Sequence, residues 1–392
     1  MLRNIFNFLS SLRLTIVSLG AAIVLVFFGT IAQVNLGGHD VQTRFFQSLI
    51  IMWPLGSQGW SIPVFPGGHL IGAILLINLI AAHLRRFRWT RHKLGIQLIH
   101  GGLIIMLAGG LFTDLFATES FMRLAPGETR DYSEDGRTME LAVIDQSNNK
   151  YDQVTSIPDV KLKTGEAIEH ESLPFRILVH QFYQNSRLTP SSKANEVGQS
   201  PANRGEGRLF SVEALPHATA ENKRDSESAI IEILPLQQTD SKDNPALGSW
   251  LVSDQISQPQ TFTYGGKNWS IALRLKRYYM PYTLMLQKFT HEHFPGTEIA
   301  KNFTSTVTLI DPSQKEDRQV LIYMNHPLRY RGNTYFQSGF EPDDTATILE
   351  VVHNPVFVAP YLACIVIAAG LLLQFGSHLY TFSRRRNLLT AS

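Results

Sequence analysis

Four long apolar runs and one long, mostly polar stretch dominate the pattern of the chain. The runs cover residues 14–34, 69–84, 94–116 and 356–375. A helix needs about 20 apolar residues to cross the hydrocarbon core of a bilayer, which is close to the length of these runs. The pattern predicts a membrane protein with four transmembrane α-helices. The first run is longer than the apolar core of a signal peptide, so we expect it to stay uncleaved.

The stretch between the third and fourth runs, residues 117–355, has a different pattern. Short alternating or β-branched runs recur in it, with glycine and proline turn signals between many of them. They cover residues 138–145, 175–183, 229–234, 270–275, 305–310, 319–324, 334–336 and 346–352. We therefore expect a large, mostly antiparallel β domain, sandwich-like or barrel-like. Three parts follow: a membrane region at 1–116, the β domain at 117–355, and a last helix with a basic tail at 356–392.

Basic residues are concentrated in three short segments beside the apolar runs. Arg3 and Arg13 precede the first run, residues 85–93 between the second and third contain four arginines and a lysine, and residues 384–386 are arginines. Such residues accumulate on the cytoplasmic side of membrane proteins. A four-span chain places all three segments on one side, so we expect cytoplasmic termini and an extracytoplasmic β domain.

Composition excludes several classes of function. The chain is 44% hydrophobic and 17% charged with a mean hydropathy of −0.03, which fits apolar spans joined to a polar domain. The net charge of +2 does not indicate nucleic-acid binding. Cys364 is the single cysteine, so an internal disulfide, a zinc ribbon and dithiol redox chemistry are excluded within this sequence. We found no Walker loop, no Ser-His-Asp order and no dinucleotide-binding glycine motif.

Histidines are the candidate ligands for a metal or haem. An ionisable residue inside a span is costly and is a functional hypothesis by default. His83 lies near the end of the second run and His100 lies about two turns into the third, beside Gly101 and Gly102. Imidazole is a common axial ligand of haem iron, and neighbouring glycines leave room for a flat macrocycle. An interfacial role for His83 and an interhelical hydrogen bond for His100 remain alternatives.

The other histidines favour simpler roles. His291 and His293 flank Glu292 without the spacing of a helical metal site, and we expect them in a solvated loop. His39, His69 and His353 border the expected outer surface, where an interfacial role and an outer-face ligand are both possible interpretations.

Several motifs resemble the ResB (CcsB) family of System II cytochrome c biogenesis. Residues 8–15 read FLSSLRLT, residues 94–103 read LGIQLIHGGL, and residues 324–338 read MNHPLRYRGNTYFQS. The segment from Asn325 to Ser338 is the most specific of these. No tryptophan-rich stretch is present, so the chain resembles the unfused ResB half.

The resemblance implies a subunit that works with a ResC (CcsA)-type membrane partner. Together they would carry haem b across a bacterial inner membrane, rather than a thylakoid membrane, and present it to apocytochrome c for covalent attachment. This chain would be at most an accessory, non-catalytic subunit of the cytochrome c haem lyase, and thiol-reducing membrane proteins are further expected partners. The family's membrane haem site uses a second-helix histidine, which matches His83 here, together with one from the partner. His100 matches a recurring third-helix histidine.

Two other functions remain open from the residues themselves. The chain could be a b-type electron-transfer subunit in which His83 and His100 bind one haem within the chain. It could also be a receptor or sensor that has an outer β domain and no cofactor.

Overall fold

We describe the protein from a computed structural model of the whole chain. The structure describes residues 2–55, 60–86, 93–148, 150–190, 202–218, 224–236, 247–293, 296, 300–341 and 345–390. Four helices in these ranges are long and apolar enough to cross a membrane: Leu12–Leu36, Gly68–Arg85, Leu94–Phe116 and Ala359–Ser383. The predicted set of four apolar helices and a large antiparallel β domain is therefore confirmed.

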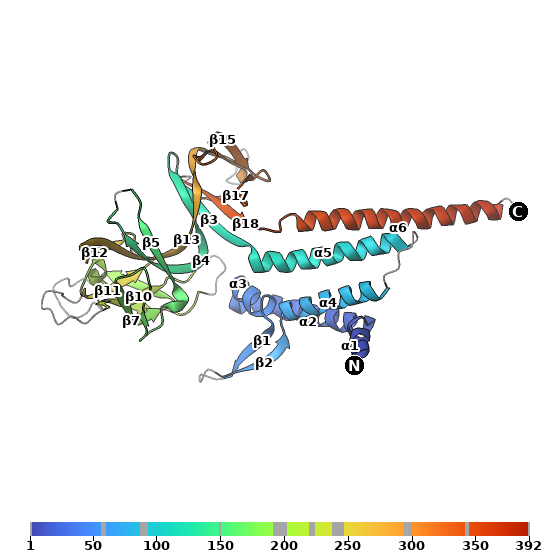
Figure 1. The fold of residues 1–392 in the computed structure, drawn as a ribbon, viewed down its shortest axis with the longest axis horizontal. Coiled ribbons are helices and arrows are strands. Elements are labelled where there is room, and N and C mark those ends of the chain that lie inside the picture. Colours follow the sequence, from blue (N-terminus) through green and yellow to red (C-terminus); the bar gives the residue numbers. More distant parts are fainter. Residues whose placement is uncertain are drawn as a thin grey trace. The chain divides into compact units, whose positions relative to one another are not determined.

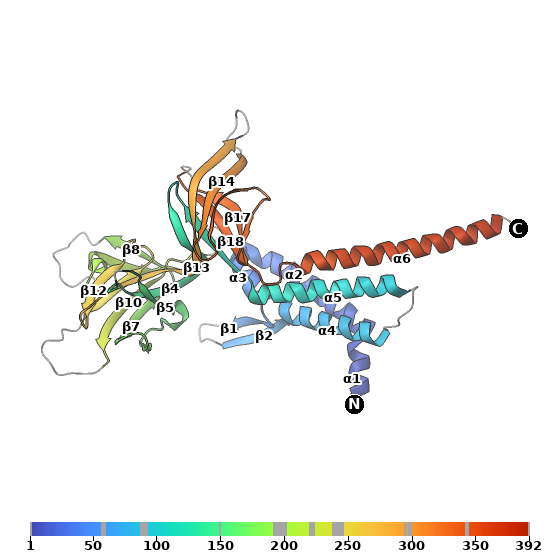
Figure 2. The same cartoon turned by 45° about the horizontal axis from the view of Figure 1, so that its top comes forward.

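The chain divides into two compact units. The first, which we call the helical unit, holds the residues up to Thr118 and those from His353 onward. Its helical and hairpin elements, in chain order, are α1 (Leu2–Leu9), α2 (Leu12–Leu36), α3 (Gly38–Val41), the π-helical turn η1 (Gln42–Phe46), strands β1 (Ile50–Leu55) and β2 (Trp60–Pro66), α4 (Gly68–Arg86), α5 (Leu94–Phe116) and α6 (Ala359–Thr390). Helix α5 runs between α4 and α6 (Figures 1 and 2).

Glycines on one face of α5 allow α6 to pack closely. Gly95, Gly102 and Gly109 are seven residues apart, so they return to nearly the same face of the helix, and all three are buried. A Cβ atom on Gly95 would lie 2.8 Å from the backbone nitrogen of Gln374, and one on Gly102 would lie 2.5 Å from Cγ1 of Ile367. Small residues allow such close contact between helices in lipid, where apolar burial gives no net driving force.

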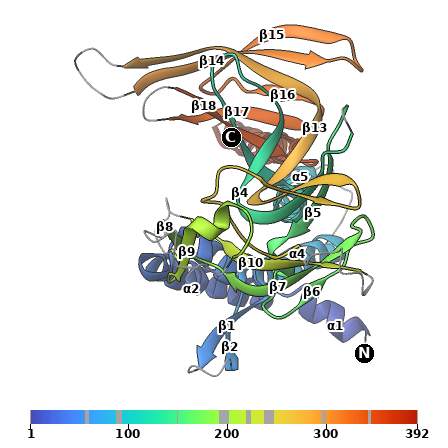
Figure 3. The ribbon, with the colours of Figure 1, turned by 90° about the vertical axis from the view of Figure 1, so that its left-hand side faces the viewer.

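The second unit, the β unit, holds residues 119–218 and 222–352. Its strands are β3 (Thr118–Leu124), β4 (Thr129–Asp145), β5 (Gln153–Pro158), β6 (Ala167–Ile168), β7 (Phe175–Tyr183), β8 (Ser186–Pro190), β9 (Phe210–Ala214), β10 (Ser228–Pro235), β11 (Ser249–Ser253), β12 (Gln260–Tyr264), β13 (Lys267–His293), β14 (Ala300–Asp311), β15 (Glu316–Tyr323), β16 (Leu328–Tyr330), β17 (Asn333–Phe340) and β18 (Thr347–His353), with 3-10 turns η3 (Asp159–Lys161) and η4 (Glu206–Leu209). Figure 3 shows them as two groups of strands, and β13 belongs to both.

Strand β13 connects the two groups because it changes partner along its length. Its first half pairs antiparallel with β4, and its second half pairs with β14. Pairing with β4 is irregular between Tyr279 and Leu284, where Pro281 cannot donate a ladder hydrogen bond, and pairing with β14 begins at Thr283. Ile271 and Leu273 enter one buried core with β4, β7 and β10, whereas Leu284 and Leu286 enter a second with β14, β17 and β18. These are the two larger cores of the β unit, and a smaller cluster forms around Ile230 and Leu251.

The sequence predicted the positions of these strands better than their extent. Each of the eight predicted runs overlaps a strand, but the pattern did not predict that β13 is one strand of 27 residues. It also missed the hairpin β1–β2, which pairs Trp53 with Ile62. The polar stretches 189–207 and 237–248 indicate exposed loops by their composition, and they lie mostly outside the described residues.

The basic segments lie at one end of the helical unit. The two chain termini, the end of α4 and the start of α5 all lie at the same end (Figure 1). Arg85 lies at the end of α4, and Lys93 lies directly before α5. Arg88 and Arg91 lie outside the described residues. This arrangement agrees with the distribution of charge that the sequence showed.

Candidate functional site

His83 and His100 face each other in the seam between α4 and α5. The two helices are antiparallel neighbours, so a residue near the end of α4 meets one near the start of α5 (Figure 1). The centroids of the two imidazole rings are 6.2 Å apart and the ring planes are at 84° to each other. The structure therefore brings together the two histidines that the sequence singled out.

Both histidines line a cavity of about 630 Å³ that is bordered by α2, α4 and α5. Its walls are mostly aliphatic, with Leu12, Leu19, Leu75, Leu79, Leu103 and Leu107 among the lining residues. Pockets for small molecules and cofactors are typically about 300–1,000 Å³, mostly apolar, with a few placed polar groups. The cavity has the size and lining of such a site, and the imidazoles supply its metal-ligating groups.

Asn78 fixes the wall of this cavity by joining α4 to the break between α1 and α2. Its side-chain nitrogen donates to the backbone oxygens of Leu9, at 2.6 Å, and Ser11, at 3.1 Å. Its oxygen accepts from the hydroxyl of Thr15 at 2.6 Å. A helix end leaves backbone carbonyls without intrahelical partners, and Asn78, itself 3% exposed, supplies a donor to that of Leu9 at the end of α1. The contact sets the position of α2 against the helix that carries His83.

The histidines expected at the outer border have different surroundings. His69, at the start of α4, contacts the carboxylate of Asp114, near the end of α5. His39 in α3 and His353 at the end of β18 are exposed. The contact with Asp114 pairs the imidazole of His69 with a carboxylate.

Sequence reasoning overlooked Asn78 and Asp114. A signal was present for the second, since Asp114 is the single acidic residue in the apolar run from 94 to 116. An ionisable residue in such a run is a candidate functional residue by default. Asn78 had no comparable signal, because its role depends on the distant break between α1 and α2.

The interpretation of His291 as part of a solvated loop is wrong. His291 lies in β13, and its ring centroid is 4.8 Å from that of Phe303 and 4.2 Å from that of Phe340. The side chain of His293 lies outside the described parts. Within the described residues, no group of three or more His, Cys, Asp or Glu side chains is arranged to hold a metal ion.

The motif of residues 324–338 forms the hairpin β16–β17 and contributes to the second core. Leu328 and Tyr335 are buried. The hydroxyls of Tyr282 and Tyr335 are 2.7 Å apart. Tyr330 donates to the buried Asp311 at 2.8 Å. Burial opposes ionisation of Asp311, but hydrogen bonds from Ser313 and Tyr330 hold its pKa below the usual range. The most specific part of the resemblance is therefore built into the core of the β unit.

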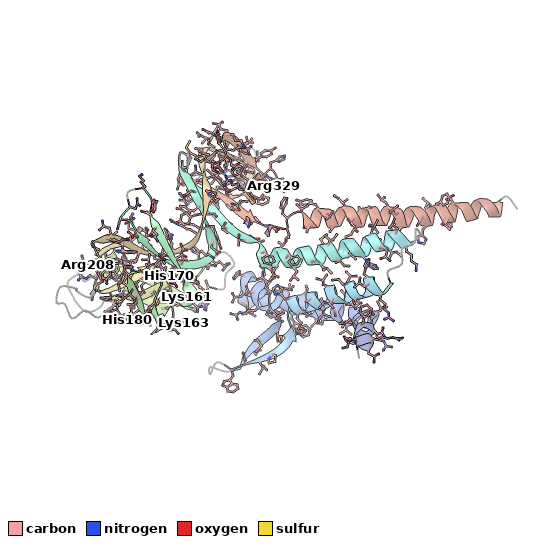
Figure 4. The ribbon with its side chains drawn as sticks, in the orientation of Figure 1. Lys161, Lys163, His170, His180, Arg208 and Arg329 are labelled. Carbon is pink, nitrogen blue, oxygen red and sulfur yellow. The ribbon has the colours of Figure 1, made fainter. Side chains whose placement is uncertain are left out.

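Charged groups of the β unit lie in several separate places. Figure 4 shows Lys161, Lys163, His170 and His180 in one part of the unit and Arg329 in another. Glu227 is the most perturbed carboxyl group: burial, and then the nearby Asp159, Asp254 and Asp225, raise its pKa to about 8. The helical unit, through His83 and His100, therefore holds the best candidate for a ligand site.

Comparison with known proteins gives one family. Residues 260–349, from β12 into β18, match the ResB-like family. Protein NrfI of Wolinella succinogenes is 36% identical over 93 residues, which make up 24% of this chain and 10% of NrfI. The match thus spans about a tenth of that relative's length.

A solved structure is also similar, but weakly. Cytochrome c heme lyase CcmF aligns with 93% of this chain and 34% of its own, at 11% identity and a TM-score of 0.20. That score is too low to support an argument about fold or function. Through residues 260–349, then, the chain is similar to ResB-family proteins, and the resemblance predicted from its sequence is confirmed.

Proposed function

We propose that this chain acts in cytochrome c biogenesis as a ResB-type membrane subunit that binds haem in the seam between α4 and α5. The observation that carries the proposal is the pair of imidazoles, His83 and His100, 6.2 Å apart on the wall of an apolar cavity of about 630 Å³. Haem is a largely apolar macrocycle whose iron takes imidazole as an axial ligand. Both properties match what the cavity offers, and haem would be held there as cargo.

The orientation in the membrane is part of the proposal. The end of α4 that carries Arg85, and with it the His83 cavity, would face the cytoplasm, and the β unit would lie outside. The support is that all the basic segments fall at that end of the helical unit. A reporter fused after Lys150 should score as extracytoplasmic, and a cytoplasmic signal from it would contradict the orientation.

The expected partners follow from the family resemblance. A ResC (CcsA)-type membrane protein would contribute its own haem-handling groups, and apocytochrome c would receive the haem. In a strain that lacks its own ResB protein, expression of this chain with such a partner should restore haem-stained cytochrome c. Failure of restoration when both proteins are present at normal levels would contradict the function.

The haem site is tested by replacing each histidine in the purified protein. His83→Ala should lower haem content at least roughly tenfold, and added imidazole should restore it, because the vacated position accepts that molecule. His378→Ala is the matched control, since His378 lies on α6 and bonds to Gln374 away from the cavity. Wild-type haem content in the His83→Ala protein would refute the site.

The same geometry favours a second candidate, an intra-chain b-type haem for electron transfer. With metal–nitrogen bonds of about 2.0–2.1 Å, two imidazoles on opposite sides of one metal have ring centroids roughly 6 Å apart. The observed 6.2 Å fits such a pair. In that case His83→Ala and His100→Ala should lose haem equally in the isolated chain. If only the His83→Ala variant loses haem, and it does so only in the complex with the partner, then the second ligand of the haem comes from the partner.

A further inference from the structure

The seam between α4 and α5 carries a second pair of polar side chains at its other end. On α4, His69 and His83 are 14 residues apart, and on α5, His100 and Asp114 are also 14 residues apart. Fourteen residues make about 3.9 helical turns and about 21 Å of rise, so each pair lies on nearly one face of its helix. Because the helices are antiparallel, His69 meets Asp114 just as His83 meets His100.

The second pair has its own cavity of about 430 Å³, and Leu107 lines both cavities. Gly72 of α4 and Gly110 of α5 line this cavity, and a Cβ atom on either would meet nothing within 4 Å. The two glycines leave open space against the helix backbones. Most other lining residues are aliphatic or aromatic, among them Phe46, Leu76 and Met106.

Hydrogen bonds prepare His69 as a ligand. Its Nε2 contacts Oδ2 of Asp114, and Oδ1 of Asp114 accepts from the side-chain nitrogen of Gln47 at 2.7 Å. A carboxylate on one ring nitrogen keeps the proton there and leaves the lone pair on the other, Nδ1, free to bind a metal. The side chain of His69 is 26% exposed, so the ring is accessible from the cavity side.

We propose that His69, oriented by Asp114, is a second binding station for an iron porphyrin, in the same seam and about 21 Å of helical rise from His83. A bare metal ion fits less well, because the described residues hold no cluster of three ligating side chains. A flat apolar macrocycle fits the open space beside Gly72 and Gly110, and its iron needs one imidazole ligand. The proposal rests on haem as the cargo of this chain and adds a place where that cargo stops before it leaves the seam.

The test is hemin titration of the full chain in lipid nanodiscs, with the first site removed by His83→Ala and His100→Ala. This double variant should still bind one hemin with a saturable Soret change. Adding His69→Ala or Gly110→Leu should weaken that binding at least roughly tenfold, because one removes the ligand and the other fills the cavity. Adding Gly101→Leu is the matched control and should have no effect, since Gly101 also faces open space but lines neither cavity.

The Asp114→Asn substitution tests whether Asp114 positions His69 as a ligand or has a structural role alone. Asparagine keeps the shape but removes the charge, so the imidazole becomes a weaker donor and the midpoint potential of the bound hemin should rise. An unchanged potential, or unchanged binding in the His69→Ala and Gly110→Leu variants, would overturn the second station. The proposed function fails on a different result, namely wild-type haem content when His83 is replaced in the otherwise unaltered chain.

Discussion

The two faces of α5 are built for opposite purposes. On one face Gly95, Gly102 and Gly109 bring α6 so close that a Cβ atom would clash at each of the three positions. On the other face His100, Leu107 and Asp114 line two cavities against α4. Packing that fills all space stabilises a helix pair, whereas a ligand needs space and polar groups to hold it. The contrast indicates that α5–α6 is the scaffold of the helical unit and α4–α5 its binding seam.

The largest effect is expected from Gly95→Ala. The new methyl group would lie 2.8 Å from backbone atoms of Gln374 and Gly370, which cannot move as a flexible side chain can. We expect the free energy of unfolding in detergent to fall by about 3 kcal/mol, at the upper end of overpacking effects. Gly101→Ala should change it little, because that position is open. Equal melting temperatures for the two variants would show that the α6-facing side of α5 is packed no more tightly than the position of Gly101.

A smaller effect is expected from Asn78→Ala on the seam side. The change removes the donor to the part-buried backbone oxygen of Leu9 and the acceptor of the Thr15 hydroxyl, at a cost of about 1–2 kcal/mol. Haem content should fall as well, because Asn78 lines the same cavity as His83. Thr30→Ala serves as control, since that exposed hydroxyl bonds only within its own helix. Unaltered stability and haem content together would show that Asn78 does not fix the position of α2 beside the cavity.

Thr113→Val tests the far end of the scaffold. The hydroxyl of Thr113 accepts from the side-chain nitrogen of Asn354 at 3.3 Å, just before α6 begins. The bond is long and partly exposed, so its loss should cost about 0.5 kcal/mol, measured by thermal unfolding. A loss as large as that from Gly95→Ala would mean that this end, and not the glycine face, holds α6 in place.

The smallest effect is expected from Cys364→Ala. Cys364 is an exposed free cysteine on α6, next to the buried Ala363 that packs on α5. Removal of the thiol should change the free energy of unfolding by less than about 0.5 kcal/mol and leave cytochrome c maturation intact. Loss of maturation at normal protein abundance would reveal a thiol function that the single-cysteine argument excludes.

The β unit shows where pattern reasoning succeeds and where it stops. Alternation along residues 175–183 predicted β7 within its observed bounds, because a half-buried strand needs a period of two. The same reasoning divided β13 into a strand and a loop, which put His291 in the wrong environment. A strand that pairs with β4 and then with β14 changes which residues it buries, so no single period runs through it.

The sequence by itself determined the four apolar helices, the β-rich unit, the placement of basic residues and the resemblance to the ResB family. The resemblance that the sequence itself carried lies in residues 8–15, 94–103 and 324–338. The sequence also identified His83 and His100 as candidates, since an imidazole in an apolar run is costly. Only the tertiary structure decided that these two side chains meet, and that His69 meets Asp114. Helical periodicity fixes the face on which a residue lies. It does not fix which neighbouring helix covers that face or how closely, because that depends on the packing of side chains from all the helices together.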